Sequence, residues 1–413
     1  MNTLARLTAT ALLATAGGAA AAPPTTWVAS WQASPQPVWN AGFLFPTLIP
    51  GHLEAQTFRQ TARLGLGGGK LRVRLSNAYG RQPLRINAAS VAAGAGRPPL
   101  PLSFDGHSDT LIAPGKERLS DPLALATADL QAVQVSVYLA ERTPLQTFHW
   151  DGRQTASFAA GDQTLAPALT ATATTTARLF VSGIDVEVPA DARSVVVIGD
   201  SITDGATASL DRDQRWTDHL AARLTPQGVA VVNAGISGGR LLRDGMGEAA
   251  LSRFQRDVLD QSGVASVIVL LGTNDIGWPG TAFARTAPAP TLAELQAGYL
   301  GLVERAHARG VRILGATLPP FEGALPGTPL DDYYQPDKDA LRRRLNDWLR
   351  QDSPFDAVID LDAVLRDPAD PSRMAAAFDS GDHLHPGDAG NRAMADAVDL
   401  QALLPRQVPV TTP

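Results

Sequence analysis

Residues 195–205 read Val-Val-Val-Ile-Gly-Asp-Ser-Ile-Thr-Asp-Gly, and this stretch decides the fold of the second half of the chain. A short apolar run rich in β-branched residues is typical of a parallel strand that is covered on both faces. Gly199 follows the run at once, so the strand is expected to end there. Similar runs recur further along, at residues 229–232, 267–271, 311–314 and 357–361.

Amphipathic segments lie between these runs. The second of them has a capping box at its start, formed by Thr291 and Glu294. Strands that alternate with helices predict a doubly wound, three-layer α/β domain, which we place at residues 193–405. Ligands of such sheets bind outside the carboxyl ends of the strands, so any chemistry is expected there. Three apolar stripes indicate helices, at residues 251–259, 292–306 and 341–349.

The first half of the chain follows a period of two. Apolar and polar residues alternate in residues 71–75 and 133–139, as in antiparallel strands with one buried and one wet face. No long helical period interrupts this half. We therefore expect an all-β, sandwich-like accessory domain over residues 25–188. Its role stays open between a packed platform that shapes the binding cleft of the α/β domain and a carbohydrate-binding module, for which tryptophans are available at positions 27, 31, 39 and 150.

Composition narrows the possible functions. The 413 residues are 44% hydrophobic and 18% charged, with a net charge of −6, so neither nucleic acid nor an anionic membrane surface is indicated as a partner. Cysteine is absent, which excludes thiol chemistry and disulfides. No segment after the N-terminus has the run of about 20 apolar residues that spans a bilayer, and we expect no stable membrane association.

Residues 1–21 have the pattern of a signal peptide. Arg6 supplies a positive start, an Ala- and Leu-rich apolar stretch follows, and Ala19-Ala20-Ala21 offers small residues for cleavage. We expect removal of this segment and a secreted or periplasmic bacterial protein.

Four polar segments stand out at or beyond the strand ends. The first three directly follow the runs that begin at 195, 229 and 267, and the fourth lies beyond the last strand, where it can loop back. They are Gly-Asp-Ser-Ile-Thr-Asp-Gly at 199–205, Asn-Ala-Gly-Ile-Ser-Gly-Gly at 233–239, Gly-Thr-Asn-Asp at 272–275 and Asp-His-Leu-His-Pro at 382–386.

Taken together and in this order, the four segments resemble the SGNH hydrolase superfamily, also called GDSL esterases. The resemblance covers roughly residues 193–400 and implies a serine esterase. It implies that Ser201 is the nucleophile, His385 the general base and Asp382 the carboxylate that orients the histidine. Ile202 stands where the family name has leucine, and both residues are apolar.

The resemblance also implies an oxyanion hole. Its donors would be the backbone N–H groups of Ser201 and Gly238 and the side-chain amide of Asn274. A hydroxyl needs a base within hydrogen-bond reach, and histidine suits that task near neutral pH. Preorganised donors then stabilise the oxyanion that attack on an ester creates. No cofactor is implied.

Several other residues have alternative interpretations. Ser237 lies in Gly-Ile-Ser-Gly-Gly, which matches the nucleophile elbow of α/β-hydrolases, but no helix pattern opens after it. His383 and His385 could hold a metal with Asp382, although no further ligands cluster nearby. Asp200 and Asp275 are expected to brace the turns that carry their neighbours. The remaining histidines carry no pattern and are taken as ordinary surface or core residues: His52, His107, His149, His219 and His307.

The substrate is the least defined feature. A narrower resemblance rests on the sequence of residues 199–205, the loop at 379–382 and the β-rich half. Together these resemble a branch of arylesterases and acylhydrolases found with plant-polysaccharide degradation. That resemblance implies hydrolysis of short-chain esters through an acyl-enzyme, with an acetylated polysaccharide or oligosaccharide as partner. An arylesterase, a lysophospholipase, an acyltransferase and a non-catalytic carbohydrate-binding protein remain alternatives. An aromatic wall for a sugar or aryl group is available in Trp278, Tyr333 and Tyr334, which could equally be packing residues.

Overall fold

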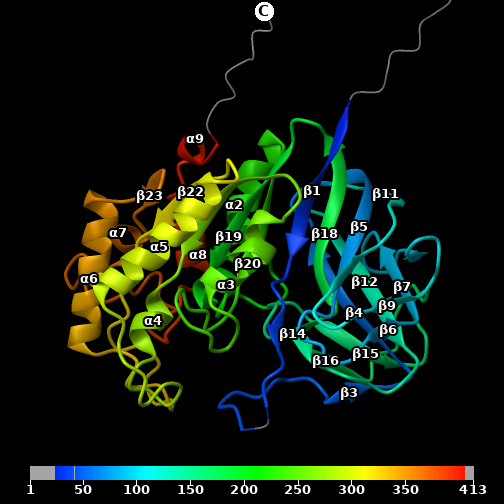
Figure 1. Ribbon diagram of the computed structural model, residues 1–413, viewed down its shortest axis with the longest axis horizontal. Helices are drawn as coiled ribbons and strands as arrows, with labels where there is room; N and C mark the ends of the chain where they lie inside the picture. Colours follow the sequence, from blue (N-terminus) through cyan, green and yellow to red (C-terminus); the bar gives the residue numbers. More distant parts are fainter. Residues whose placement is uncertain (1–23, 41, 405–413) are drawn as a thin grey trace, which may run out of the picture.

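The computed structural model describes residues 24–40 and 42–404, which form two lobes side by side (Figure 1). One lobe consists of strands from the first half of the chain, and the other is the α/β lobe of the second half. The expected signal peptide lies outside the described residues. None of the helices in the described part combines the length and hydrophobicity needed to cross a bilayer.

Two antiparallel sheets share the core of the β lobe. Alternating residues such as Val73, Val135 and Val186 point into that core and are fully or almost fully buried, as the period of two predicts. The first sheet has the order β1-β18-β5-β10, with β11 also paired to β5: β1 Thr25–Gln32, β18 Val181–Pro189, β5 Gly68–Ser76, β10 Glu117–Leu119 and β11 Leu123–Thr127. The second has the order β16-β15-β4-β12-β7-β8: β16 Ala173–Thr175, β15 Ala156–Ala160, β4 Gln56–Arg63, β12 Ala132–Leu139, β7 Ala88–Ala92 and β8 Leu100–Pro101.

Three small sheets complete the lobe, and one of them matters for function. That sheet joins β17, β14 and β2, and its middle strand β14 ends at His149 beside the α/β lobe. The strands of the small sheets are β2 Gln36–Pro37, β14 Thr147–His149, β17 Arg178–Leu179, β3 His52–Leu53, β13 Thr143–Pro144, β6 Leu84–Ile86 and β9 Thr110–Ile112.

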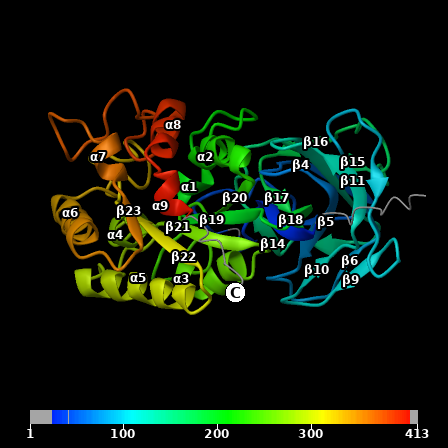
Figure 2. The same cartoon turned by 90° about the horizontal axis from the view of Figure 1, so that it is seen from above.

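A parallel five-stranded sheet of order β20-β19-β21-β22-β23 organises the α/β lobe. Helices cover both of its faces, with α2 and α8 on one side and α3 and α5 on the other (Figure 2). The strands are β19 Arg193–Gly199, β20 Val229–Gly235, β21 Val264–Leu270, β22 Arg312–Ala316 and β23 Ala357–Ile359. The helices are α1 Ser201–Asp204, α2 Trp216–Leu224, α3 Ala250–Phe254, α4 Thr273–Gly277, α5 Leu292–His307, α6 Pro336–Gln351, α7 Leu361–Leu365, α8 Asp388–Asp396 and α9 Leu400–Leu403.

The fold class predicted from the sequence is confirmed: a parallel α/β domain follows a mostly stranded region. The capping box at Thr291 and Glu294 is present at the start of α5, with the Thr291 side chain accepting from the Glu294 N–H. The helix expected at 251–259 is present but not uniform. It begins as α3 and finishes as a π-helical turn at Gln255–Leu259, after which the turn of residues 260–262 leads to Gly263 at φ 71°.

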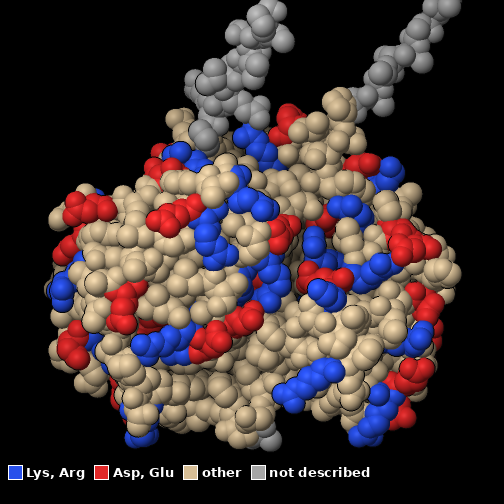
Figure 3. Space-filling model, in the orientation of Figure 1, with Lys and Arg blue, Asp and Glu red and all other residues tan. Residues whose placement is uncertain are grey.

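The two lobes pack directly against each other along the edge of the parallel sheet. Strand β1 lies beside β20 (Figure 1), and the Ala29 N–H donates to the carbonyl of Ser262 at 2.8 Å. Thr225 donates from its hydroxyl to the Gly65 carbonyl at 3.0 Å. On the face shown in Figure 3, acidic and basic side chains are interspersed over both lobes, without a broad field of one sign.

Candidate active site

Ser201 is the first residue of helix α1, immediately after strand β19. Asp200 caps this helix, because its Oδ1 accepts a hydrogen bond from the Ile202 N–H at 3.0 Å. The cap is buried, and burial raises the pKa of Asp200 to about 7. The sequence therefore folds locally into a capped strand-to-helix turn that holds the serine at the carboxyl edge of the sheet.

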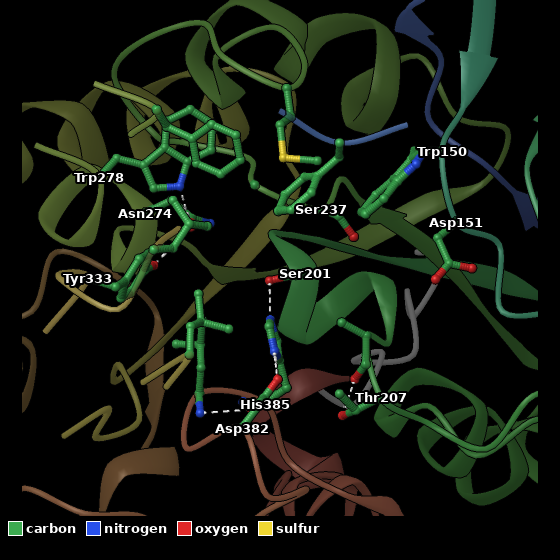
Figure 4. Close-up of a pocket in the computed structure, with 18 residues that line it drawn as sticks. Trp150, Asp151, Ser201, Thr207, Ser237, Asn274, Trp278, Tyr333, Asp382 and His385 are labelled. Atoms are coloured by element: carbon green, nitrogen blue, oxygen red, sulfur yellow. Dashed lines mark hydrogen bonds and ion pairs between the residues drawn. The ribbon is translucent and has the colours of Figure 1, made fainter. Parts of the chain in front are cut away.

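His385 and Asp382 reach Ser201 from the loop before α8. The Ser201 Oγ lies 2.7 Å from Nε2 of His385, and Nδ1 of His385 lies 2.6 Å from Oδ2 of Asp382 (Figure 4). The three residues that the sequence suggested are thus brought together from positions 184 residues apart. This arrangement has a hydroxyl, a base and an orienting carboxylate in one line.

Asp382 is held in its ionised form. Partial burial by itself would raise the pKa of Asp382, but the His385 side chain and the backbone N–H groups of His385 and Leu384 outweigh it and hold the pKa well below its usual range. Its Oδ1 accepts from those two N–H groups at 2.8 and 3.0 Å. The carboxylate is therefore fixed from its own loop and presents Oδ2 to the imidazole.

Donors for an oxyanion are available beside the serine. Within the described residues, neither the N–H of Ser201 nor that of Gly238 has a hydrogen-bond acceptor. Gly238 has φ 71°, and a Cβ there would come within 2.3 Å of the sulfur of Met246, so only glycine fits. Asn274 follows strand β21 on α4, and its Nδ2 donates one hydrogen to the Gly239 carbonyl at 3.1 Å.

The amide of Asn274 is held in one orientation. Its Oδ1 accepts from Nε1 of Trp278 and from the hydroxyl of Tyr333, both at 2.9 Å. Burial raises the pKa of Tyr333 well above its ordinary value, so the phenol keeps the proton that it donates. With the oxygen fixed in this way, the second hydrogen of Nδ2 remains available to a ligand.

The three aromatic residues expected to form a wall therefore have different roles. Trp278 and Tyr333 line the cavity but are almost fully buried, and their polar atoms donate hydrogen bonds to Asn274. Tyr334 does not belong to the cavity lining, and its hydroxyl donates to Glu322 at 3.2 Å. The i, i+4 spacing of Asn274 and Trp278 on a helix could have indicated the first contact.

Two carboxylates support the surrounding loops. Asp275 accepts from the N–H groups of Leu241 and Leu242 at 2.7 and 2.9 Å, and burial raises its pKa to about 6. It thereby fixes the chain that follows Gly238 and Gly239. The bracing roles expected for Asp200 and Asp275 agree with these contacts.

Ser237 has different partners from Ser201. Its Oγ donates to Oδ2 of Asp204 at 2.7 Å, and no histidine lies within hydrogen-bond distance of it among the described residues. The segment after Ser237 is irregular up to α3, so the helix that a nucleophile elbow requires does not follow. His149, which carries no pattern in the sequence, contacts the other oxygen of Asp204 at 2.9 Å.

A cavity of about 220 Å³ opens at Ser201 and His385. Most of the side chains that line it are apolar. The β lobe contributes Phe45, Trp150 and Asp151 to the lining. Trp150 and Asp151 lie opposite Asn274, Trp278 and Tyr333 (Figure 4). The remaining lining residues are Ser201, Ala206, Thr207, Ser237, Gly238, Met246, Phe283, Leu325, Leu330, Asp382, Leu384 and His385.

Aromatic rings continue the β-lobe wall around the cavity. Phe45 stacks on Trp150 with centroids 5.5 Å apart, and Phe283 stacks on Trp278 at 4.6 Å. Phe45 also meets Phe283 edge to face at 5.2 Å, which joins the two lobes at the cavity. Sequence periodicity could not reveal this wall, because its members come from separate loops.

His383 is directed to a different carboxylate from His385. Its Nδ1 lies 2.5 Å from Oδ2 of Asp379, and its side chain is half exposed. Over residues 24–40 and 42–404, no group of three or more His, Cys, Asp or Glu side chains is placed to hold a metal ion.

The second half of the chain matches a known protein family. Residues 197–393 match the GDSL-like lipase/acylhydrolase family. Among solved structures, the chain is similar to a GDSL-like lipase from Bacteroides thetaiotaomicron, with 19% identity and a TM-score of 0.36 over 50% of this chain and 85% of that one. It is also similar to an acetyl xylan esterase from Geobacillus stearothermophilus, with 24% identity and a TM-score of 0.36 over 50% of this chain and 92% of that one. No curated protein matches the chain.

The family match spans all four polar segments and most of the α/β lobe. Its residues also include the serine and the histidine that meet at 2.7 Å. The second half of the chain therefore belongs to the GDSL-like lipase/acylhydrolase family of SGNH hydrolases, and the protein is a carboxylic ester hydrolase.

Proposed function

We propose that Ser201 is the nucleophile of a two-step ester hydrolysis. As its Oγ attacks the carbonyl carbon, Nε2 of His385 takes the hydroxyl proton, and the ionised Asp382 stabilises the resulting imidazolium. The imidazolium then protonates the leaving alcohol. Water attacks the acyl-enzyme with His385 again as base, which releases the acid and restores the serine.

The oxyanion of each step would be bound by three donors. These are the N–H groups of Ser201 and Gly238 and the free hydrogen of the Asn274 amide. The single observation that carries this proposal is the continuous contact from Ser201 Oγ through His385 to Asp382, at 2.7 and 2.6 Å, at the floor of an open cavity.

The cavity lining favours a particular class of ester. Apart from the reacting groups, the residues around Ser201 are mainly aromatic and aliphatic, including Phe45, Met246 and Leu330. Such a surface stabilises an apolar group by burial and leaves few polar atoms to bind sugar hydroxyls. We therefore propose an ester with an apolar acyl or aryl group as the preferred substrate.

Deacetylation of a plant polysaccharide, which the sequence resemblance implies, remains a prediction. Both substrate classes can be compared in one experiment. Initial rates are measured on aryl esters of increasing acyl length, on acetylated xylan and other acetylated polysaccharides, and on a lysophospholipid. We expect the highest kcat/KM on the aryl esters. Fast acetate release from a polysaccharide, with weak activity on every aryl ester, would contradict the proposed preference.

A variant in the aromatic wall of the cavity sharpens this comparison of substrate classes. Phe283→Ala enlarges the cavity beside Trp278, so it is expected to lower kcat/KM for bulky aryl esters more than for methyl acetate. Burying a phenyl ring contributes about 2–3 kcal/mol, which corresponds to roughly 30- to 150-fold as an upper limit. Phe58→Leu, in the core of the β lobe away from the cavity, is the matched control for altered packing.

We further propose export of the protein after removal of residues 1–21. The support is the order of positive, apolar and small residues in that segment. Mass spectrometry of the protein recovered outside the cytoplasm is expected to find Ala22 as the first residue. Recovery of the full chain inside the cytoplasm would contradict this.

A further inference from the structure

A buried chain of polar contacts joins the β lobe to the loop that carries Gly238. Nε2 of His149 lies 2.9 Å from Oδ1 of Asp204. The other oxygen of Asp204 accepts from both the N–H and the hydroxyl of Ser237, at 2.9 and 2.7 Å. All three side chains are almost fully buried, at 5%, 3% and 5% exposure for His149, Asp204 and Ser237. Polar groups so deeply buried are costly unless each is paired, as they are here.

Both ring nitrogens of His149 have a hydrogen-bond partner. Nδ1 of His149 lies 3.0 Å from the carbonyl of Ser34, so both ring nitrogens face atoms that only accept. A hydrogen on each ring nitrogen would satisfy both contacts. Burial alone would raise the pKa of Asp204, but contacts with His149 and Ser237 outweigh it and hold the pKa below its ordinary value.

Asp204 occupies a central position between the reacting groups. It is the last residue of α1, the helical turn that begins with Ser201. Ser237, which it holds by two hydrogen bonds, directly precedes Gly238. The nucleophile and one oxyanion donor are therefore fixed to the same carboxylate, and that carboxylate is fixed in turn by His149.

The β lobe itself is firmly anchored where it supplies this histidine. Gln32 donates to the Asp257 carbonyl at 2.9 Å, and Gln36 donates to the Met246 carbonyl at the same distance. Met246 in turn packs against the position of Gly238. The lobe thus contacts the oxyanion loop from two directions.

We propose that His149 is a positioning residue of the catalytic reaction, acting through Asp204 to hold the Ser237–Gly238 loop where the Gly238 N–H meets the oxyanion. This inference rests on the proposed function of Ser201. It makes the β lobe a part of the catalytic machinery, although no residue of that lobe takes part in the chemistry. A purely structural contact between the lobes, without effect on the reaction, is the competing interpretation.

The test measures kcat and KM for a short-chain aryl ester in His149→Ala and His149→Gln. Active molecules are counted by titration with a phosphonylating reagent that labels the reactive serine, so that kcat refers to folded enzyme. We expect His149→Ala to lower kcat by about 10- to 100-fold, less than the loss of a whole oxyanion donor. KM should stay within about threefold, because the oxyanion contact forms only in the transition state.

Two further comparisons separate positioning from stability. Glutamine retains an N–H that can reach Asp204, so His149→Gln should recover part of the lost kcat. His107→Ala, an exposed histidine of the same lobe, should leave kcat unchanged. In a double-mutant cycle, Asp204→Asn and His149→Ala should lower kcat by less than the product of their separate effects, because they break the same chain.

The outcomes distinguish this inference from the proposed function. If His149→Ala melts at a lower temperature but keeps the wild-type kcat per titrated site, the contact between His149 and Asp204 is merely structural and the inference is wrong. Equal kcat values for the alanine and glutamine variants would also contradict it. If the wild-type protein hydrolyses no ester, or Ser201→Ala hydrolyses as fast, the proposed function itself is at fault.

Discussion

The protein contains two constellations of serine, histidine and aspartate, and they differ in the order of their contacts. In the first, Ser201 touches His385, which touches Asp382. In the second, Ser237 touches the carboxylate of Asp204, and the histidine lies on its far side. A base must contact the hydroxyl that it deprotonates, so only the first order suits attack on an ester. Residue types alone therefore do not identify a catalytic triad.

The position of each histidine relative to the cavity also separates the two constellations. The first opens into the cavity of about 220 Å³. In the second, neither His149 nor Asp204 lines the cavity, and Ser237, which does line it, donates its hydroxyl hydrogen to Asp204. The comparison indicates that the first group reacts and the second holds it in place.

The largest effect on kcat is expected when the serines of the two constellations are replaced by alanine one at a time. Ser201→Ala should lower kcat for an aryl ester by roughly 10⁵- to 10⁶-fold, as expected when a nucleophile is removed. Ser237→Ala keeps the backbone hydrogen bond to Asp204 and should lower kcat by less than about tenfold. A greater loss in Ser237→Ala than in Ser201→Ala would reverse the assignment of the two groups.

A second test exchanges the two carboxylates for amides. Asp382→Asn should lower kcat by roughly 10³- to 10⁴-fold, because an amide favours the wrong histidine tautomer, while the melting temperature changes little. Asp204→Asn places an NH₂ group against other donors and should cost about 1–3 kcal/mol of unfolding free energy. Its kcat should fall only about 10- to 100-fold. Urea unfolding and kinetic measurements on the same preparations give the free energy of unfolding and kcat. Equal losses of both quantities in the two variants would contradict the different roles of the two carboxylates.

The smallest predicted effect concerns Asp200, whose turn links the two constellations. Its pKa of about 7 exceeds the value of about 4 that an unfolded aspartate has, so the folded protein retains a proton that the unfolded chain releases. The free energy of unfolding should therefore fall as the pH rises from about 4 to about 7. Asp200→Asn keeps an acceptor for the Ile202 N–H but cannot ionise.

The Asp200→Asn variant should accordingly gain stability relative to the wild type as the pH rises. The expected gain between about pH 5 and pH 8 is on the order of a few kcal/mol, since each pKa unit corresponds to about 1.4 kcal/mol. Urea unfolding of both proteins at the two pH values measures it. A stability difference that does not change with pH would show that Asp200 is ionised throughout.

The first constellation was accessible from sequence, whereas the second was not. Ser201 and Asn274 directly follow apolar runs, and the spacing of Asp382 and His385 places both on one loop. His149 has no such local signal, because its partner Asp204 lies in the other lobe and 55 residues away. The same holds for Tyr333, which meets Asn274 across 59 residues after an irregular segment. Contacts that depend on how two lobes pack together produce no periodic pattern in the sequence of either segment.

The pairing of His149 with Trp150 has a consequence for how this enzyme can change. In extended chain, consecutive side chains point to opposite sides. Here the first turns inward to Asp204, and the second forms part of the substrate cavity. Inserting or deleting one residue in this stretch would exchange the two positions. Variation in substrate preference at this point is therefore limited to substitutions, since any change in length would also displace the histidine that holds the reacting groups.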